Sequence, residues 1–317
     1  MRQCSESDRA RILAYIAREP EMNLFVYGDI ENFGVCGGPV EVFVQERAAV
    51  GQTPRLPGAA DAAACPGAGL RGMADGPAGA AREQQLSAGA GACGAAGSPA
   101  ASAAWDCLVL RYFDNYIVYS PDDGYDAAAA AAFLQGRTVE CISGKTSVIA
   151  PLAPLFPRAV LRPTTLSRCS TAPAPVPLAA GAQVRRLTQA DVPAVIALFC
   201  SVEEFADTYR GREEKAAREM CTNLTQGGMA AGVFCGGVLA ACAETSAGST
   251  QSAMVVGVAA HPDWRGRGFA TAALTEVCRA AFAQGVQFLC LFYDNPAAGR
   301  IYAKAGFVPV GSYAMLR

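Results

Sequence analysis

The stretch from Ser252 to Phe307 constrains the fold of this chain more than any other part of it. Its apolar run from Ala253 to Ala260 fits a strand that is buried on both faces. His261-Pro262-Asp263 ends this strand, because a proline cannot donate to a β-ladder. The segment Arg265 to Ala270 contains two glycines, and apolar residues then recur at helical spacing as far as Phe282. The pattern predicts a strand, a glycine turn and a helix in direct succession.

A second strand and a second helix are predicted after this unit. The residues from Val286 to Phe292 are mainly apolar and fit the strand. Asn295-Pro296 has the composition of a helix start, with Asn295 as the N-cap and Pro296 at the first helical position. Tyr302 then lies two helical turns further along the same face as Asn295.

The glycine turn is suited to binding an anion. A helix N-terminus presents unpaired N–H groups and the positive end of a dipole, and glycines let a phosphate approach the backbone. Arg265 and Arg267 add positive charge. A P-loop would need Gly-Lys-Ser/Thr, which is absent, and Gly266 and Gly268 lead to Thr271 instead of completing a dinucleotide fingerprint. The pyrophosphate of coenzyme A is the third candidate ligand.

Three motifs in this stretch resemble those of the GNAT N-acetyltransferase superfamily. Arg265-x-x-Gly268-x-Ala270 looks like the acyl-CoA motif, Arg/Gln-x-x-Gly-x-Gly/Ala. The preceding Val256-x-Val258-x-x-x-Pro262 resembles the fourth strand of that family. The later segment Asn295-x-x-Ala298-x-x-x-Tyr302-x-x-x-Gly306-Phe307 is similar to the helix and turn that follow. The resemblance covers roughly residues 183 to 317.

The resemblance implies an α/β (α+β) fold for residues 182–317, with a mixed, mainly antiparallel twisted sheet flanked by helices. It implies acetyl-CoA as cosubstrate and no metal. The pantetheine would lie along the motif strand, the pyrophosphate on the glycine turn, and the thioester near the last helix. The implied cofactor-binding residues are Val256, Gly257, Val258, Arg265, Gly266, Arg267, Gly268, Phe269, Ala270, Asn295 and Ala298.

An N-acyl transfer needs a base for the amine and a proton for the leaving thiolate. The resemblance implies Tyr302 as the general acid, and a tyrosine that only packs its helix is the alternative. Glu244 ends the strand beside the motif strand, where this family often places a carboxylate, and a solvated acid is the alternative. Glu203 and Glu204 are expected on the loop after the first helix, a region that lines the substrate in this family.

Composition excludes several other classes of function. The formal net charge of -2 leaves no overall basic surface for nucleic acid, and no apolar run reaches the ~18 residues of a membrane-spanning helix. The thirteen cysteines form no C-x-x-C pair, and His261 is the only histidine, so neither a zinc site nor a histidine-dependent hydrolase is expected. His261 itself fits a structural polar residue at a turn. The charged N-terminus does not resemble a signal peptide, and we expect a cytoplasmic protein with reduced thiols.

Residues 1–167 are predicted to form a smaller α+β domain with the order helix, strands, helix, strand. It lacks the acyl-CoA motif, and it is interpreted as a degenerate GNAT-like domain or an unrelated cap domain. Residues 47–104 are rich in Ala, Gly and Pro without an apolar period, which predicts a disordered insertion. Gly28 to Asn32 is a polar cluster, read as a turn with a capping acid or alternatively as a site. The proline-rich residues 168–181 are the predicted connector.

These observations favour an acyl-CoA-dependent N-acetyltransferase that acts by direct transfer to a small-molecule or peptide amine. A non-catalytic acyl-CoA-binding regulator is the alternative from another class. A binder of small phosphate compounds without coenzyme A is a third hypothesis.

Overall fold

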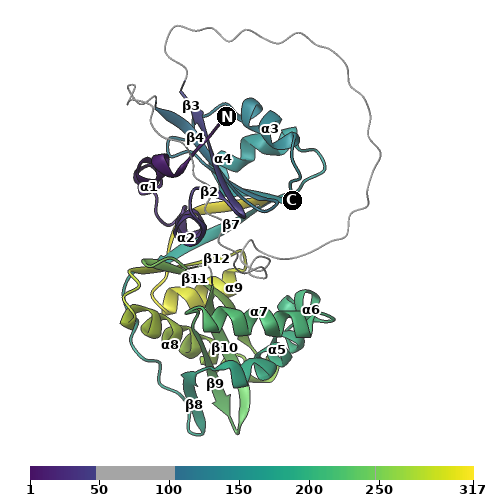
Figure 1. The fold of residues 1–317 in the computed structure, drawn as a ribbon. Coiled ribbons are helices and arrows are strands. Elements are labelled where there is room, and N and C mark those ends of the chain that lie inside the picture. Colours follow the sequence, from purple (N-terminus) through teal and green to yellow (C-terminus); the bar gives the residue numbers. More distant parts are fainter. Residues whose placement is uncertain (48–103, 247) are drawn as a thin grey trace.

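The computed structural model describes residues 1–47, 104–246 and 248–317 (Figure 1). The predicted insertion at residues 47–104 lies outside the described residues except at its two ends. There the N–H of Arg47 donates to the carbonyl of Ala104 at 2.6 Å. The strands on either side of these ends pair antiparallel, as predicted for a hairpin.

We call the chain up to Cys169 the first half and the chain from Ala182 the second half. The elements of the first half are β1 (Arg2–Gln3), η1 (Glu6–Asp8), α1 (Arg9–Ile16), α2 (Leu24–Phe33), β2 (Cys36–Gly37), β3 (Val40–Glu46), β4 (Trp105–Tyr112), β5 (Asn115–Tyr119), α3 (Ala127–Gln135), β6 (Cys141–Lys145), α4 (Thr146–Ile149), η2 (Ala150–Leu155) and β7 (Leu161–Cys169).

The second half has nearly the same order of helices and strands. Its elements are β8 (Ala182–Arg186), η3 (Gln189–Asp191), α5 (Val192–Ser201), α6 (Glu203–Tyr209), α7 (Glu213–Thr225), β9 (Ala230–Cys235), β10 (Val238–Ser246), β11 (Ser252–Ala260), η4 (Pro262–Trp264), α8 (Phe269–Ala283), β12 (Phe288–Tyr293), α9 (Pro296–Lys304) and β13 (Val308–Leu316).

The two halves begin with the same local structure. Arg2 pairs with Asp8 across the first turn of the first half, with 3.0 Å between nitrogen and oxygen. Arg185 pairs with Asp191 at the corresponding place in the second half, at 2.6 Å. Each aspartate also accepts a hydrogen bond from the backbone three residues before it. The repeated order and the repeated first turn indicate that the chain contains two copies of one fold.

All the described strands belong to one mixed, mainly antiparallel sheet. Its order is β1-β3-β4-β5-β6-β13-β7-β12-β11-β10-β9-β8, with β2 paired to β3. The only parallel pairs among these strands are β5 with β6 and β11 with β12, one in each half. Helices cover the sheet, as the fold class predicted (Figure 1).

The two halves exchange their last strands at the centre of the sheet. β7, from the first half, pairs with β12 of the second half, and β13, from the second half, pairs with β6 of the first. β7 and β13 also pair with each other, from Leu161↔Leu316 to Arg168↔Val308. Figure 1 accordingly shows the C-terminus among the elements of the first half. Each half therefore completes the sheet of the other.

Helix α2 packs between the two halves. One apolar cluster joins residues of α1, α2 and β3–β5 to Met254, Phe288 and Cys290 of β11 and β12. Another cluster places α8 on the opposite face of β10–β12, with Ala273 and Leu274 fully buried. The first half thus covers one face of the strands that carry the sequence motifs, and α8 covers the other.

Most predicted elements of the second half are confirmed, including the β9–β10 hairpin, β11, α8 and the start of α9 at Pro296. Three predictions need correction. Glu203 and Glu204 begin helix α6 and do not lie in a loop. The cluster from Gly28 to Asn32 lies inside α2 and is not a turn. β7 continues to Cys169, so the connector begins two residues later than predicted. The division into two domains stays a prediction.

No helix within residues 1–47, 104–246 and 248–317 is long and apolar enough to cross a bilayer.

Candidate functional site

The two parallel strands of the second half separate where the motif residues lie. β11 and β12 pair only from Ser252↔Phe288 to Met254↔Cys290. Beyond this point β11 continues for six residues without pairing to β12. Val256, Gly257 and Val258, which were predicted to bind pantetheine, are half-buried in this separated part. On the side toward β12 their backbone groups have no strand partner, and an extended chain with amide groups is able to pair with such an edge.

Gly257 interrupts the regular strand. Its φ is +60°, in the left-handed region that favours glycine. A Cβ atom at this position would lie 2.9 Å from Oε1 of Glu244 and 2.9 Å from Cζ of Phe199. The register of β10 and β11 shifts between Cys242 and Glu244, next to this glycine. The irregular backbone therefore makes room for the Glu244 carboxylate beside the gap.

Glu244 is half-buried, and no described residue donates a hydrogen bond to its carboxylate. Burial raises the pKa of Glu244 to about 7, because a low-dielectric environment disfavours the charged form. A carboxylate with this pKa is able to accept a proton near neutral pH. Glu244 therefore stays a candidate base, and a solvated strand-end acid stays the alternative.

The glycine turn after η4 leads directly into α8. Gly266 and Gly268 both have φ of +78°, and Gly268 is the N-cap of α8. A Cβ atom at either glycine would meet no atom within 4 Å, so the backbone angle and not a lack of space favours glycine here. Phe269 and Ala270 are buried in the first turn of the helix. The turn thus presents open backbone at a helix N-terminus, which is the geometry of an anion site.

Two arginines flank this turn in different surroundings. Nη2 of Arg265 donates to Oε2 of Glu204 on α6 at 2.9 Å. The backbone N–H of Glu204 and then this arginine hold the pKa of Glu204 below its usual value. The guanidinium of Arg267 lies 4.8 Å from the ring centroid of Trp264. Glu204, predicted to line the substrate, therefore contacts an arginine of the glycine turn.

Helix α9 brings the predicted general acid close to β12. The side chain of Asn295 accepts a hydrogen bond from the N–H of Ala297 at 2.8 Å, as an N-cap. The ring of Tyr302 lies 5.5 Å from that of Tyr293 on β12. Burial raises the pKa of Tyr302 to about 12, so its hydroxyl keeps its proton at neutral pH. No described residue hydrogen-bonds to this hydroxyl, and Ala298 is half-buried on the same helix.

The corresponding loop of the first half, between β5 and α3, is acidic. It contains Asp122, Asp123 and Asp126, and it has no arginine. Oδ1 of Asp126 accepts from the N–H of Ala129 at 2.9 Å and so occupies the N-terminus of α3. A phosphate would meet carboxylates here, in contrast to the turn before α8.

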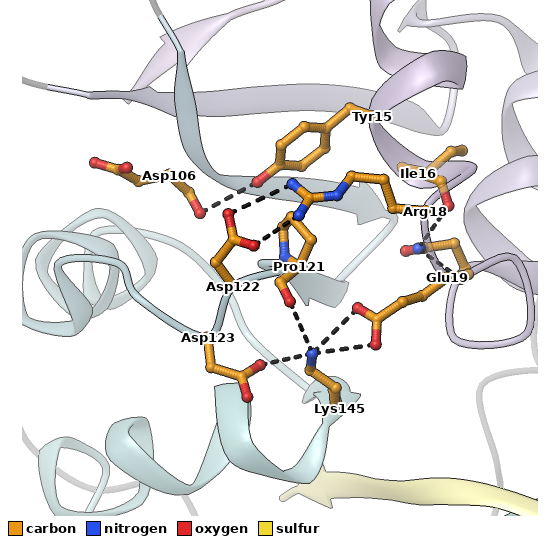
Figure 2. A network of polar contacts seen from close by, with 10 residues as sticks. Tyr15, Ile16, Arg18, Glu19, Asp106, Pro121, Asp122, Asp123 and Lys145 are labelled. Carbon is orange, nitrogen blue, oxygen red and sulfur yellow. Dashed lines mark hydrogen bonds and ion pairs between the residues drawn. The ribbon is translucent and has the colours of Figure 1, made fainter.

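A network of ion pairs closes the end of β6 beside this acidic loop (Figure 2). Lys145, whose side chain is only 14% exposed, contacts Asp123 at 2.7 Å and Glu19 at 3.1 Å. Arg18 pairs with Asp122 at 2.6 Å. Figure 2 shows Lys145 between the two carboxylates and the carbonyl of Pro121. These contacts tie the α1–α2 connection to the acidic loop.

His261 has a structural role. Nδ1 of His261 accepts from the N–H of Asp263 at 3.3 Å and caps the turn after β11, as the sequence predicted. Within the described ranges, no three His, Cys, Asp or Glu side chains are grouped as metal ligands.

Asp29 belongs to the polar cluster from Gly28 to Asn32, for which a site was the alternative to a turn with a capping acid. This residue of α2 is half-buried, and burial raises its pKa to about 7. The cluster's composition drew attention to this segment, but the burial of Asp29 depends on the packing of α2 against the second half and has no local signal.

Comparison with known proteins agrees with this geometry. Residues 197–307 match the model of the acetyltransferase (GNAT) family. Among solved structures, a GCN5-related N-acetyltransferase from Kribbella flavida is 17% identical, with a TM-score of 0.50 over 67% of this chain and 86% of that one. A Drosophila protein is 11% identical, with a TM-score of 0.58 over 99% of this chain and 97% of that one. At these identities the likeness shows the fold alone. Among curated proteins, no sequence matches this chain.

Proposed function

We propose that this chain, whose residues 197–307 belong to the acetyltransferase (GNAT) family, moves an acetyl group from acetyl-CoA to an amine by direct transfer. The observation that carries the proposal is the separation of β11 from β12 immediately before an open glycine turn at a helix N-terminus. One feature accommodates an extended chain with amide groups, and the other accommodates a pyrophosphate. In acetyl-CoA an extended chain with amide groups, the pantetheine, is followed by a pyrophosphate.

The residues around the gap divide the binding of acetyl-CoA between them. The backbone of residues 256–258 would pair with pantetheine, which replaces the missing partner of β11. The backbone of residues 266–270 would bind the pyrophosphate, with Arg265 and Arg267 supplying positive charge. The side chain of Asn295 is engaged in capping α9, so we expect this residue and Ala298 to contribute position and backbone.

The chemical step uses groups on both sides of the gap. Glu244 accepts a proton from the acceptor, and the amine nitrogen attacks the thioester carbonyl carbon. A backbone N–H near Val258 donates to the oxyanion, the C–S bond breaks, and Tyr302 gives its proton to the sulfur. The products are an N-acetyl amide and coenzyme A with a free thiol. The raised pKa of Glu244 suits a base near neutral pH, whereas the raised pKa of Tyr302 keeps its hydroxyl protonated but makes it a weaker acid.

The acceptor approaches from the α2 side in this proposal. Glu244 and Val256 are directly paired across β10 and β11, so their side chains project from the same face of the sheet. Val256 packs on the cluster that contains α2. Glu203, exposed at the start of α6, stays a candidate for the entrance to this cleft. The first half would shape the cleft without binding acetyl-CoA, because its corresponding loop carries three aspartates.

The test measures release of free coenzyme A by the purified chain with a panel of amines. Calorimetry with acetyl-CoA, ATP and NAD examines ligand choice in parallel. The proposal expects acetyl-CoA to bind in preference to the two nucleotides and at least one amine to release coenzyme A. Binding of acetyl-CoA without turnover for any amine would favour a regulator. Equal binding of all three ligands would favour a general phosphate binder.

A further inference from the structure

One face of α2 is turned toward the second half of the chain. Phe25, Gly28 and Asp29 lie on this face, at helical spacing. The ring of Phe25 is stacked on that of Phe292 in β12, with 6.1 Å between centroids. A Cβ atom at Gly28 would lie 2.9 Å from the carbonyl oxygen of Gly248. Asp29 therefore lies on the side of α2 that faces β11 and β12.

Contacts at the end of α2 hold this orientation. Glu31 accepts hydrogen bonds from the N–H of Thr250 at 2.8 Å and from its hydroxyl at 3.0 Å. The close approach of Gly28 to the same loop leaves no room for a larger residue. The helix is therefore fixed against the second half near both Phe25 and Glu31.

The half-buried carboxylate of Asp29 has no described partner. No described residue hydrogen-bonds to its carboxylate, and no described Lys or Arg pairs with it. Burial, and in small part the Asp29 charge, raises the pKa of Tyr313, whose hydroxyl is engaged with Ser143. A half-buried carboxylate without a partner costs free energy in the folded chain, and an arriving cation would offset that cost.

Glu244 shares this property and projects from the face of the sheet that α2 covers. Among the described residues, Asp29 and Glu244 are the two half-buried carboxylates whose pKa is raised to about 7 by burial alone. The Glu244 side chain has this direction because Glu244 is paired with Val256 on β11. The rings of Phe25 and Phe292 lie on this face as well. The same face of the sheet thus carries Glu244 and is faced by Asp29, two carboxylates without described partners, together with aromatic and aliphatic side chains.

We propose that Asp29 binds a second cationic group of the acceptor, so that the preferred acceptors are diamines or other amines that carry an additional positive charge. This inference rests on the proposed function, in which Glu244 receives the proton of the reacting amine. The ammonium at the other end of the molecule pairs with Asp29, and the methylene chain between them lies along the apolar wall. The first half then supplies acceptor specificity through α2.

The experiment compares matched amines on the full chain and on Asp29→Asn. Cadaverine and pentylamine have the same carbon chain and differ in one ammonium, and spermidine adds a third. Initial rates of coenzyme A release give kcat and KM, and calorimetry measures amine binding without turnover. Asp29→Glu retains the charge as a conservative variant. Glu140→Gln removes one exposed carboxylate of the same half as a control for overall charge.

In Asp29→Asn we expect KM for the diamines to rise at least tenfold, which corresponds to about 1.4 kcal/mol of binding. The kcat, the KM for pentylamine and the KM for acetyl-CoA should stay within about threefold of the wild-type values. Asp29→Glu should recover part of the loss, and Glu140→Gln should match the wild type. Unchanged diamine kinetics in an active Asp29→Asn enzyme would overturn the inference and leave the proposed function intact. A further outcome is a wild type that binds diamines but releases no coenzyme A with any amine. Loss of that binding in Asp29→Asn would then support the cation site and contradict the proposed transferase activity.

Discussion

Arg265 and Glu204 form an ion pair between the glycine turn and helix α6, with 2.9 Å between Nη2 and Oε2. The arginine expected to bind pyrophosphate is thus engaged with a carboxylate of its own chain. Both side chains are about half exposed, so the pair contributes little to stability. If Arg265 binds the pyrophosphate as proposed, acetyl-CoA must compete with Glu204 for the same guanidinium.

Glu204→Gln should therefore tighten binding of acetyl-CoA. An exposed ion pair is worth about 0.2–1 kcal/mol, so the dissociation constant should fall by roughly 1.4- to 5-fold. Calorimetry with acetyl-CoA at low salt measures the change. Glu203→Gln removes the neighbouring charge on the same helix without breaking the pair, and it should have a smaller effect. Weaker binding in Glu204→Gln would mean that the glutamate orients Arg265 for the ligand.

Gly268→Asp tests the anion site directly. The substitution adds a negative charge at the N-cap of α8 and a side chain where φ is +78°. Affinity for acetyl-CoA should fall at least tenfold, or about 1.4 kcal/mol. Gly285→Asp introduces the same residue at φ of +89° beyond the other end of α8, and it controls for backbone strain. If Gly268→Asp binds acetyl-CoA as tightly as Gly285→Asp does, the turn is not the pyrophosphate site.

The sequence predicted the second half well because its information is local. The apolar run of β11, the positive-φ glycines and the Asn295 cap each depend on neighbours in the chain. The burial of Glu244 does not depend on its neighbours in the chain, because it results from the irregular backbone at Gly257 and the ring of Phe199. Helix α6 was missed because Glu203 and Glu204 follow α5 without a typical capping residue.

Sequence patterns did not predict that the two halves exchange β7 and β13. Neither strand alternates cleanly, and their partners are decided by the far end of the chain. One signal of the internal repeat was present in the sequence. Arg2-x-x-Ser5-x-x-Asp8 recurs as Arg185-x-x-Thr188-x-x-Asp191, and both copies form the same turn.

The strand exchange predicts that the halves depend on each other for folding. Residues 1–172 expressed alone would lack β13 beside β6, and residues 173–317 would lack β7 beside β12. Each fragment would expose unpaired strand edges, which favour aggregation. We expect neither fragment alone to show a cooperative thermal transition, and co-expression to yield a soluble complex of one copy of each. A cooperative transition in either isolated fragment would contradict this dependence.

Glu244→Gln should change both stability and the pH dependence of turnover. The folded chain keeps a proton on Glu244 up to about pH 7, whereas the ordinary pKa is 4.5, so the wild type loses stability as pH rises through this window. The neutral variant does not, and its Tm should exceed that of the wild type above about pH 7 and match it below pH 4.5. Wild-type turnover should rise with pH through about 7, and the variant should lack this rise. A lower Tm for the variant at high pH would show that the carboxylate has a stabilising partner.

Tyr302→Phe distinguishes an enzyme from a regulator. The substitution removes the hydroxyl and keeps the ring against Tyr293 and Phe307, so the packing of α9 should survive. General acid catalysis is worth roughly 10²–10⁴-fold, and a thiolate leaves readily, which puts the expected loss of turnover at about 10²-fold. Binding of acetyl-CoA should be nearly unchanged, since the hydroxyl acts in the transition state.

Tyr293→Phe is the matched control for Tyr302→Phe, because its ring lies 5.5 Å from that of Tyr302 on the neighbouring strand. It removes a hydroxyl from the same aromatic pair and should retain turnover near the wild-type rate. A steady-state assay of coenzyme A release, with calorimetry on the same samples, separates loss of chemistry from loss of binding. Full activity in Tyr302→Phe would show that this tyrosine has only a packing role. A bound water would then be the next candidate for the general acid. Equal losses in both variants would point to a disturbed aromatic contact instead of a missing proton donor.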